Sequence, residues 1–197
     1  GATFASNVAI TTADNSDTLT LVSTDADANA GPILVFDRTS SSPADNDLIG
    51  QIVFQAKNDA GQDTDYAAVK SYILDASDGT EDGQYNIETM VSGTLQTRLL
   101  VSSSEIVLNE SSIDVDFRVE SNGNANMLFV DGGNDNVGIG TATCTNSSGF
   151  HTLSISGSTG GQIAFQTNGT GKQYIYSNDT DLNIWNSIDG SLRFHTN

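Results

Sequence analysis

Carboxylates are the most abundant groups in this sequence that could carry out chemistry. Cleavage of a glycosidic bond needs two carboxyl groups roughly 5–10 Å apart, one of them with a raised pKa. Two clusters could supply such a pair: Asp75, Asp78, Glu81 and Asp82, or Asp114 and Asp116. Turn chemistry accounts for acidic residues beside glycine in the first cluster, and a solvated strand face accounts for the second. We therefore expect no catalytic residue within one chain and no enzyme, while a pair formed between chains stays open.

The other ligand-bearing residues are too scattered for a metal site. Asp25, Asp27 and Asn29 have the spacing of the first half of a calcium loop. The glycine falls one position late, however, and Phe36 stands where glutamate is needed. The two histidines and Cys144 lack zinc-ligand spacing, and no phosphate-binding or dinucleotide-binding glycine motif is present. The sequence predicts neither a metal nor a cofactor.

Aromatic side chains are the best candidates for binding. A flat ring can stack on the face of a sugar, and Tyr174, Tyr176 and Trp185 lie close together in the sequence. Tyr174 and Tyr176 would share one face of a strand, since alternate residues point the same way. We predict these three residues as receptor contacts; packing in a core is the open alternative.

Charge excludes several partners. The net charge is −18, and 22 of the 25 acidic residues precede residue 136. Such a field repels phosphate backbones and anionic headgroups, so we expect no nucleic-acid binding. No apolar run is long enough for a membrane helix, and no signal peptide is present, so we expect no membrane insertion. Because residue 1 is glycine, we expect a fragment or a processed product of a longer protein.

Short apolar segments bounded by Gly, Asn, Asp or Ser predict about fourteen strands and an all-β fold. The segment 66–74 could instead form two helical turns, but its Tyr, Ile and Leu residues favour a strand. The predicted strands are 33–36, 50–55, 66–74, 85–91, 95–101, 105–108, 113–119, 127–130, 137–139, 153–155, 163–165, 174–176, 182–185 and 192–194.

An internal repeat indicates two modules with the same arrangement of strands. GQIVFQ at 50–55 returns as GQIAFQ at 161–166, and a turn rich in Asn and Gly follows each copy. The polar stretch 141–149 is a plausible boundary. We therefore predict a connecting segment (1–30), an acidic β-rich module (31–143) and a neutral, polar β-rich module (144–197).

One chain supplies few means of protecting its strands. Lys and Pro, which block sheet edges, are rare, and segments such as 113–119 have one apolar face. Three chains intertwined about an axis, as modules like β-prisms or β-sandwiches, would pair the edges and cover the apolar faces. A single-chain β-sandwich is the alternative.

Residues 114–141 resemble a module of bacteriophage tail fibres and related virion appendages. The matching strings are FRVESNG, MLFVD and NVGIGT, and LSISGS, GQIAFQ, GKQYIYSN and DLNIWNSIDGSLRF then resemble modules that follow it. In NVGIGT we expect Val137 and Ile139 on one side, and Gly138 and Gly140 allowing close approach near a three-fold axis.

The resemblance implies a homotrimeric structural protein of the virion, located in a tail appendage. Its expected role is a shaft or adhesion segment for host attachment. Its expected partners are its own copies, other tail or virion proteins, and a glycan or other receptor on the host surface. The alternatives are a capsid decoration or head-fibre protein, a tailspike-type polysaccharide hydrolase, and a bacterial surface adhesin.

Overall fold

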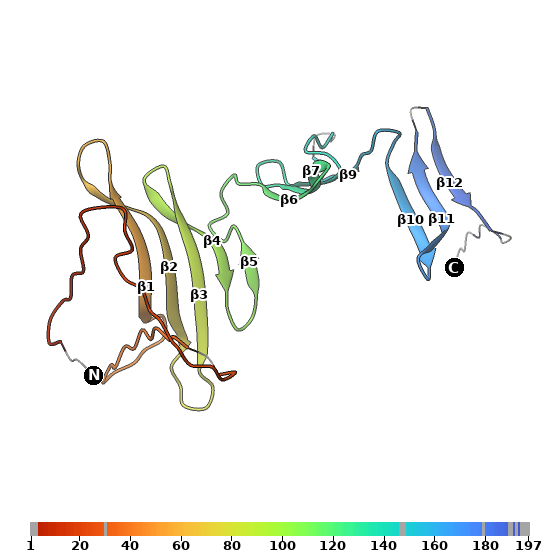
Figure 1. Ribbon diagram of the computed structural model, residues 1–197. Coiled ribbons are helices and arrows are strands. Elements are labelled where there is room, and N and C mark those ends of the chain that lie inside the picture. The colour runs from red at the N-terminus through yellow and green to blue at the C-terminus, as the bar shows by residue number, and fades with distance from the viewer. Residues whose placement is uncertain are drawn as a thin grey trace. The chain divides into compact units, whose positions relative to one another are not determined.

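The computed structural model describes residues 4–29, 31–145, 149–178, 180–188, 191 and 193. The chain divides into two units, Gly1–Pro43 and Ala44–Asn197. In the described part of the first unit, every side chain is exposed and no strand or helix forms. The second unit contains twelve strands in three sheets, and its described residues include no helix (Figure 1). The predicted all-β class is confirmed.

The first sheet has five strands in sequence order, each antiparallel to the next. Its long central strands contain β-branched and aromatic residues, which suit a pleated surface. We call it the five-stranded sheet. Its strands are β1 (Leu48–Lys57), β2 (Asp63–Asp75), β3 (Asp82–Val91), β4 (Thr94–Val101) and β5 (Ile106–Leu108).

Two smaller sheets follow along the chain. The four-stranded sheet contains β6 (Phe117–Ser121), β7 (Asn124–Asp131), β8 (Asn136–Ile139) and β9 (Leu153–Ile155). Its last pair, β8 with β9, is parallel. The three-stranded sheet contains β10 (Gln162–Thr167), β11 (Thr170–Ser177) and β12 (Leu182–Asn186), all antiparallel.

Two predicted strands are wrong in whole or in part. Residues 33–36 form no strand, although they are apolar, and all four side chains are exposed. An extended segment without a neighbouring strand has no ladder to join. Residues 113–116 form a loop before β6, because Asn109 Nδ2 donates to the Ile113 carbonyl (2.7 Å) and closes a turn. The ambiguous segment 66–74 is a strand, as predicted; of the segment 192–194 the structure describes only residue 193, so this strand stays a prediction.

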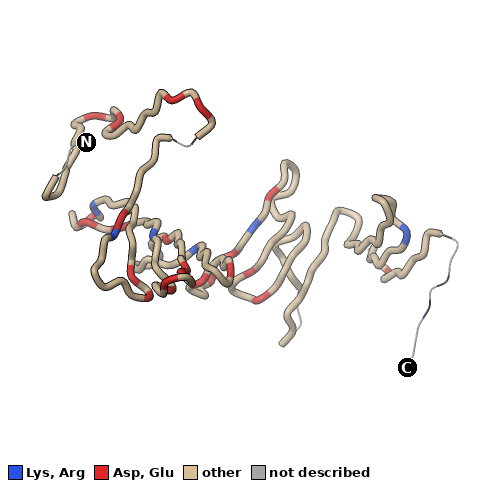
Figure 2. The backbone as a smooth tube through the Cα atoms, turned by 90° about the horizontal axis from the view of Figure 1, so that it is seen from below, with Lys and Arg blue, Asp and Glu red and all other residues tan. Residues whose placement is uncertain are grey.

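Acidic side chains follow the predicted uneven distribution. In Figure 2 they mark the tube repeatedly until the three-stranded sheet, where few occur. Several acidic side chains at strand ends or in loops accept hydrogen bonds from nearby backbone, as Asp131 at the end of β7 does from the N–H groups of Gly133 and Asn134. These carboxylates organise turns between strands.

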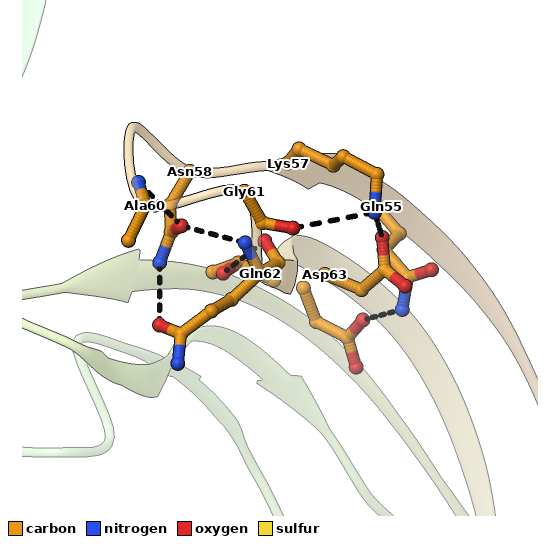
Figure 3. A network of polar contacts seen from close by, with 9 residues as sticks. Gln55, Lys57, Asn58, Ala60, Gly61, Gln62 and Asp63 are labelled. Carbon is orange, nitrogen blue, oxygen red and sulfur yellow. Dashed lines mark hydrogen bonds and ion pairs between the residues drawn. The ribbon is translucent and has the colours of Figure 1, made fainter.

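The β1–β2 hairpin shows how one polar side chain orders a turn (Figure 3). Asn58 Oδ1 accepts the N–H groups of Ala60 (3.0 Å) and Gln62 (2.9 Å), and its Nδ2 donates to Gln62 Oε1 (3.1 Å). Gly61, at φ 78°, takes the left-handed conformation that closes the turn. The turn sets where β2 begins and so the register of the first strand pair.

We expect Asn58→Ala to destabilise the fold by about 1–2 kcal/mol, because two backbone N–H groups lose their acceptor. Urea unfolding at fixed protein concentration would measure the loss. Asn58→Asp keeps Oδ1 and is the matched control, with a smaller expected loss. Equal stability of both variants and the parent would contradict this role for Asn58.

Candidate functional site

An aliphatic row crosses the whole five-stranded sheet. The strand registers align Ile52, Val69, Ile87, Leu99 and Leu108, one from each strand. A neighbouring row on the same side of the sheet includes Tyr85, Val101 and Ile106, from β3, β4 and β5. The edges of this face are open to solvent, with exposed fractions of 46% for Ile52, 51% for Leu108 and 72% for Ile106, whereas the central members of the row are half-buried.

The other two sheets repeat the arrangement. In the four-stranded sheet the row is Phe117, Val130, Val137 and Leu153; in the three-stranded sheet it is Ile163, Ile175 and Ile184. Apart from Val137, which is half-buried, all are exposed to more than a third. We call the side of each sheet that carries its row the aliphatic face. Contiguous exposed apolar surface of this kind marks an interaction site in a soluble protein.

The opposite face of the five-stranded sheet mixes polar and apolar residues and is better buried; Leu100, aligned with Asn86, is 9% exposed. Lys70 Nζ lies 2.7 Å from Glu88 Oε2, with side-chain exposures of 19% and 9%. The hydrogen bond to Glu88 raises the pKa of Lys70 above its ordinary value of 10.5. Asn86 is 6% exposed and Ala68 is 1% exposed. The sheet therefore buries an ion pair beside Ala68 and Leu100, whereas an ordinary amphipathic sheet keeps its charged residues in water.

The repeated hexapeptide has the same structural place in both copies. Ile52 and Ile163 begin the aliphatic row on the first strand of their sheets, and the register shifts directly after Phe54 and after Phe165. A bulge at the same step re-aims the following residues in the same way. The two copies of the repeated hexapeptide thus have the same geometry, in which the Ile and Phe side chains lie on the aliphatic face.

A cleft of about 320 Å³ beside the five-stranded sheet is lined in part by Arg98 and Asn109, and each of these residues has one buried side-chain polar atom that lacks a hydrogen-bond partner among the described residues. These atoms are Arg98 Nη1 and Asn109 Oδ1; Arg98 Nε donates to Thr89 Oγ1 (2.6 Å). Leu108, Val115 and Phe117 give the cleft apolar walls. Buried polar atoms without partners are costly to the folded state.

The three predicted receptor contacts lie on one face of the three-stranded sheet. Tyr174 is opposite Trp185, and Tyr176 is opposite Asn183. The Tyr174 and Trp185 rings stack, with centroids 5.5 Å apart and planes inclined by 28°. Trp185 is 53% exposed, whereas both tyrosines are half-buried. We call the side formed by Tyr174, Tyr176, Asn183 and Trp185 the aromatic face. It lies opposite the aliphatic face of the same sheet.

Gly171 and Asn183 contribute to the aromatic face but were not singled out by sequence reasoning. A Cβ on Gly171 would collide with the Tyr174 hydroxyl and lie 2.8 Å from Tyr174 Cζ, so the Tyr174 ring lies across this glycine. Asn183 stands two residues before Trp185 on the same strand. Alternation along β12 could have revealed Asn183, whereas the position of Gly171 depends on the bulge between Phe165 and Gln166.

The candidate catalytic carboxylates are engaged in turns. Hydrogen bonds from the side chain and backbone of Ser77 and from Thr80 hold the pKa of Asp75 below its ordinary value. Glu81 accepts the Gly79 N–H (3.1 Å). Asp116 precedes β6 rather than lying within a strand, and accepts the Gly132 N–H (3.2 Å). A general acid of a glycosidase needs a raised pKa, opposite to the shift at Asp75.

The residues considered as metal ligands have other partners or lie apart. Asp27 Oδ1 accepts the Asn29 N–H (2.8 Å), which lowers the pKa of Asp27. His151 Nδ1 lies 3.2 Å from the Asp135 carbonyl, and Cys144 is half-buried. Within the described ranges, no group of three or more His, Cys, Asp or Glu side chains could hold a metal ion.

The glycines of NVGIGT make close approaches within the chain. A Cβ on Gly138 would collide with the Thr141 carbonyl, and one on Gly140 with the Ser156 carbonyl. These contacts hold β8 against the following loop and the end of β9. The predicted need for glycine has this intrachain cause. Val137 and Ile139 lie on one side of β8, as expected from alternation.

Comparison with family models, with curated proteins and with solved structures gives no match. In the part of the chain that the structure describes, no helix is long and apolar enough to cross a membrane.

Proposed function

We infer that this chain is a structural, non-enzymatic segment of a bacteriophage tail fibre, which assembles as a homotrimer and serves host attachment. The observation that carries the inference is the exposed aliphatic row on each of three successive sheets. An aliphatic row that crosses every strand is stable in water only when something covers it. Two further copies of the same chain are the proposed cover.

The exposed area supports partners of large contact surface. The chain exposes 15141 Å², whereas a compact folded monomer of its mass, 20.7 kDa, exposes roughly 8,900 Å². Part of the excess belongs to the first unit, whose described side chains are all exposed; obligate interfaces commonly bury 2,000–5,000 Å² or more.

Charge favours copies that meet through these rows. With a net charge of −18, identical chains repel each other wherever their acidic surfaces approach. The row from Ile52 to Leu108 and the row from Ile163 to Ile184 contain no charged residue. The aliphatic faces are therefore the surfaces on which like-charged copies can associate at least electrostatic cost.

A structural role also agrees with the carboxylates. A turn carboxylate whose pKa is lowered by hydrogen bonds, as at Asp75, stays ionised near neutral pH and is a poor general acid. The same holds for Asp131, where Asn134 is the main cause of the lowered pKa. The carboxylates of these turns serve the fold in this proposal.

Sedimentation equilibrium and native mass spectrometry of the purified chain test the assembly directly. We expect three times the mass of the 20.7 kDa chain across a wide concentration range. A folded monomer would overturn the proposal.

Two further measurements separate the alternatives. Labelled antibody on intact particles should mark the tail; a label on the head would favour a capsid decoration or head-fibre protein. Incubation with capsular polysaccharide should release no new reducing ends; their release would favour a tailspike hydrolase.

A further inference from the structure

We propose that the aromatic face of the three-stranded sheet binds a neutral hexopyranose, seated on the outer ring face of Trp185 beside Asn183. The inference deepens the proposed attachment function and rests on it for its biological meaning. The binding itself needs only the strands β11 and β12, so it can be tested apart from the assembly.

Trp185 presents one ring face to a ligand. The other ring face packs on Tyr174, at a centroid distance of 5.5 Å, and β12 is the last strand of its sheet. The stack fixes the indole, so little rotamer freedom is lost when a ligand binds. An aromatic face carries negative charge density that attracts the C–H groups on the flat side of a pyranose ring.

Asn183 supplies the polar half of the site. Residues two apart on a strand point to the same face about 6.6–6.8 Å apart, which places the Asn183 amide at the rim of a sugar lying on Trp185. An amide can donate to one hydroxyl and accept from another. Gln162, aligned with Tyr176 and Asn183 across the sheet, adds a second amide on this face.

The charge of the site selects a neutral ligand. The two cross-strand rows of this face are Gln162, Tyr176 and Asn183, and Ala164, Tyr174 and Trp185; neither contains a charged residue. Lys172, the one cation of β11, stands outside both rows at the register shift between β10 and β11. The whole chain, at −18, repels anionic sugars such as a uronic acid or a sialic acid.

In this proposal, one face of the three-stranded sheet binds sugar and the other face contacts sibling copies. The aliphatic row of Ile163, Ile175 and Ile184 lies on the opposite side, where sibling copies are proposed to bind. A copy bound to that row leaves the aromatic face open to solvent.

Trp185 is the single tryptophan of the chain, so its fluorescence reports on the site alone. Titration of the whole chain with methyl α-D-glucopyranoside, methyl β-D-galactopyranoside and methyl α-D-mannopyranoside should give a saturable blue shift with at least one of them. We expect a dissociation constant on the order of millimolar, because one stacked ring and a few hydrogen bonds exceed the cost of association only slightly. Glucuronic acid should give no shift.

Saturation-transfer NMR on the same glycosides compares the variants, including those without tryptophan. Trp185→Ala should weaken binding roughly tenfold or more, Trp185→Phe less, and Asn183→Ala roughly threefold to tenfold. Tyr66→Ala is the matched control, since Tyr66 is an exposed aromatic (44%) on another sheet and should bind as the parent does.

The proposal is overturned if the parent binds none of the three glycosides at about 100 mM, far above a millimolar constant. It also fails if Trp185→Ala binds as well as the parent, or if Tyr66→Ala loses as much. A change of sedimenting mass in Trp185→Ala would assign the face to contacts between copies. A monomer that binds sugar would refute the trimer alone, whereas a trimer that binds none would refute this site alone.

Discussion

Ile52→Asp is expected to convert the proposed homotrimer into single chains. The side chain is 46% exposed in one copy and stands in the aliphatic row of the five-stranded sheet. In a homotrimer the substitution would place three carboxylates in apolar contacts. Each buried ion costs several kcal/mol, so the association constant should fall by more than about a thousandfold.

Gln51→Asp is the matched control. Gln51 is the preceding residue on β1, is also exposed, and points to the opposite face. The sequence repeats the pair as Gln162 and Ile163, so Ile163→Asp and Gln162→Asp form a second, independent test. Sedimentation velocity should show lower mass for both isoleucine variants and parent mass for both glutamine variants. An unchanged mass in both isoleucine variants would refute assembly through these rows.

Strand positions were largely predictable from the sequence because alternation and turn residues act locally. The hairpin turn at Asn58 and Gly61 and the left-handed turn at Asn168 and Gly169 follow from residue type alone. One of the two failures had a non-local cause. Residues 33–36 have strand composition but no neighbouring strand within the described chain.

The candidate site was predictable only in part. Tyr174 and Tyr176 follow from alternation on one strand, but the Tyr174–Trp185 stack depends on the register between β11 and β12. That register is set by packing across the hairpins rather than by local propensity. The support of Tyr174 by Gly171 likewise depends on the bulge after Phe165.

Which face of a sheet is exposed could not be read from the pattern. Ordinary amphipathic reasoning puts Ile52 and Leu108 inside, and puts Lys70 and Glu88 in water. The structure of the single chain has the opposite order. Alternation along a strand predicts which residues share a face of the sheet. Which of the two faces is buried depends on what packs against it. This reversal gives the buried ion pair a measurable energetic role.

Lys70→Met is expected to destabilise the fold by about 3–5 kcal/mol. The Glu88 side chain, 9% exposed, would keep its charge away from water without the ammonium group 2.7 Å away. Replacing both residues, as Lys70→Met with Glu88→Leu, removes the isolated charge and should restore most of the stability, because a buried pair is often no better than an apolar one. Urea unfolding at one protein concentration would measure both variants.

Lys57 and Asp63 form the matched control pair. Their Nζ–Oδ1 distance is 2.8 Å, almost equal to that of the buried pair, but the side chains are 66% and 64% exposed. Lys57→Met should therefore cost less than about 1 kcal/mol, because solvent screens an exposed pair. Equal losses in Lys57→Met and Lys70→Met would show that burial of Glu88 contributes nothing.

The pH dependence of the same variants has a definite sign. The pKa of Lys70 is raised in the folded state, mainly by its hydrogen bond to Glu88, so the folded state holds this proton more tightly than the unfolded state. The stabilisation is complete below the ordinary value of 10.5 and is lost as pH rises through the raised pKa. The stability difference between the parent and Lys70→Met should accordingly be constant near neutral pH and shrink above about pH 10.5. A difference that persisted at higher pH would mean that the lysine stabilises the sheet through its aliphatic stem rather than through its charge.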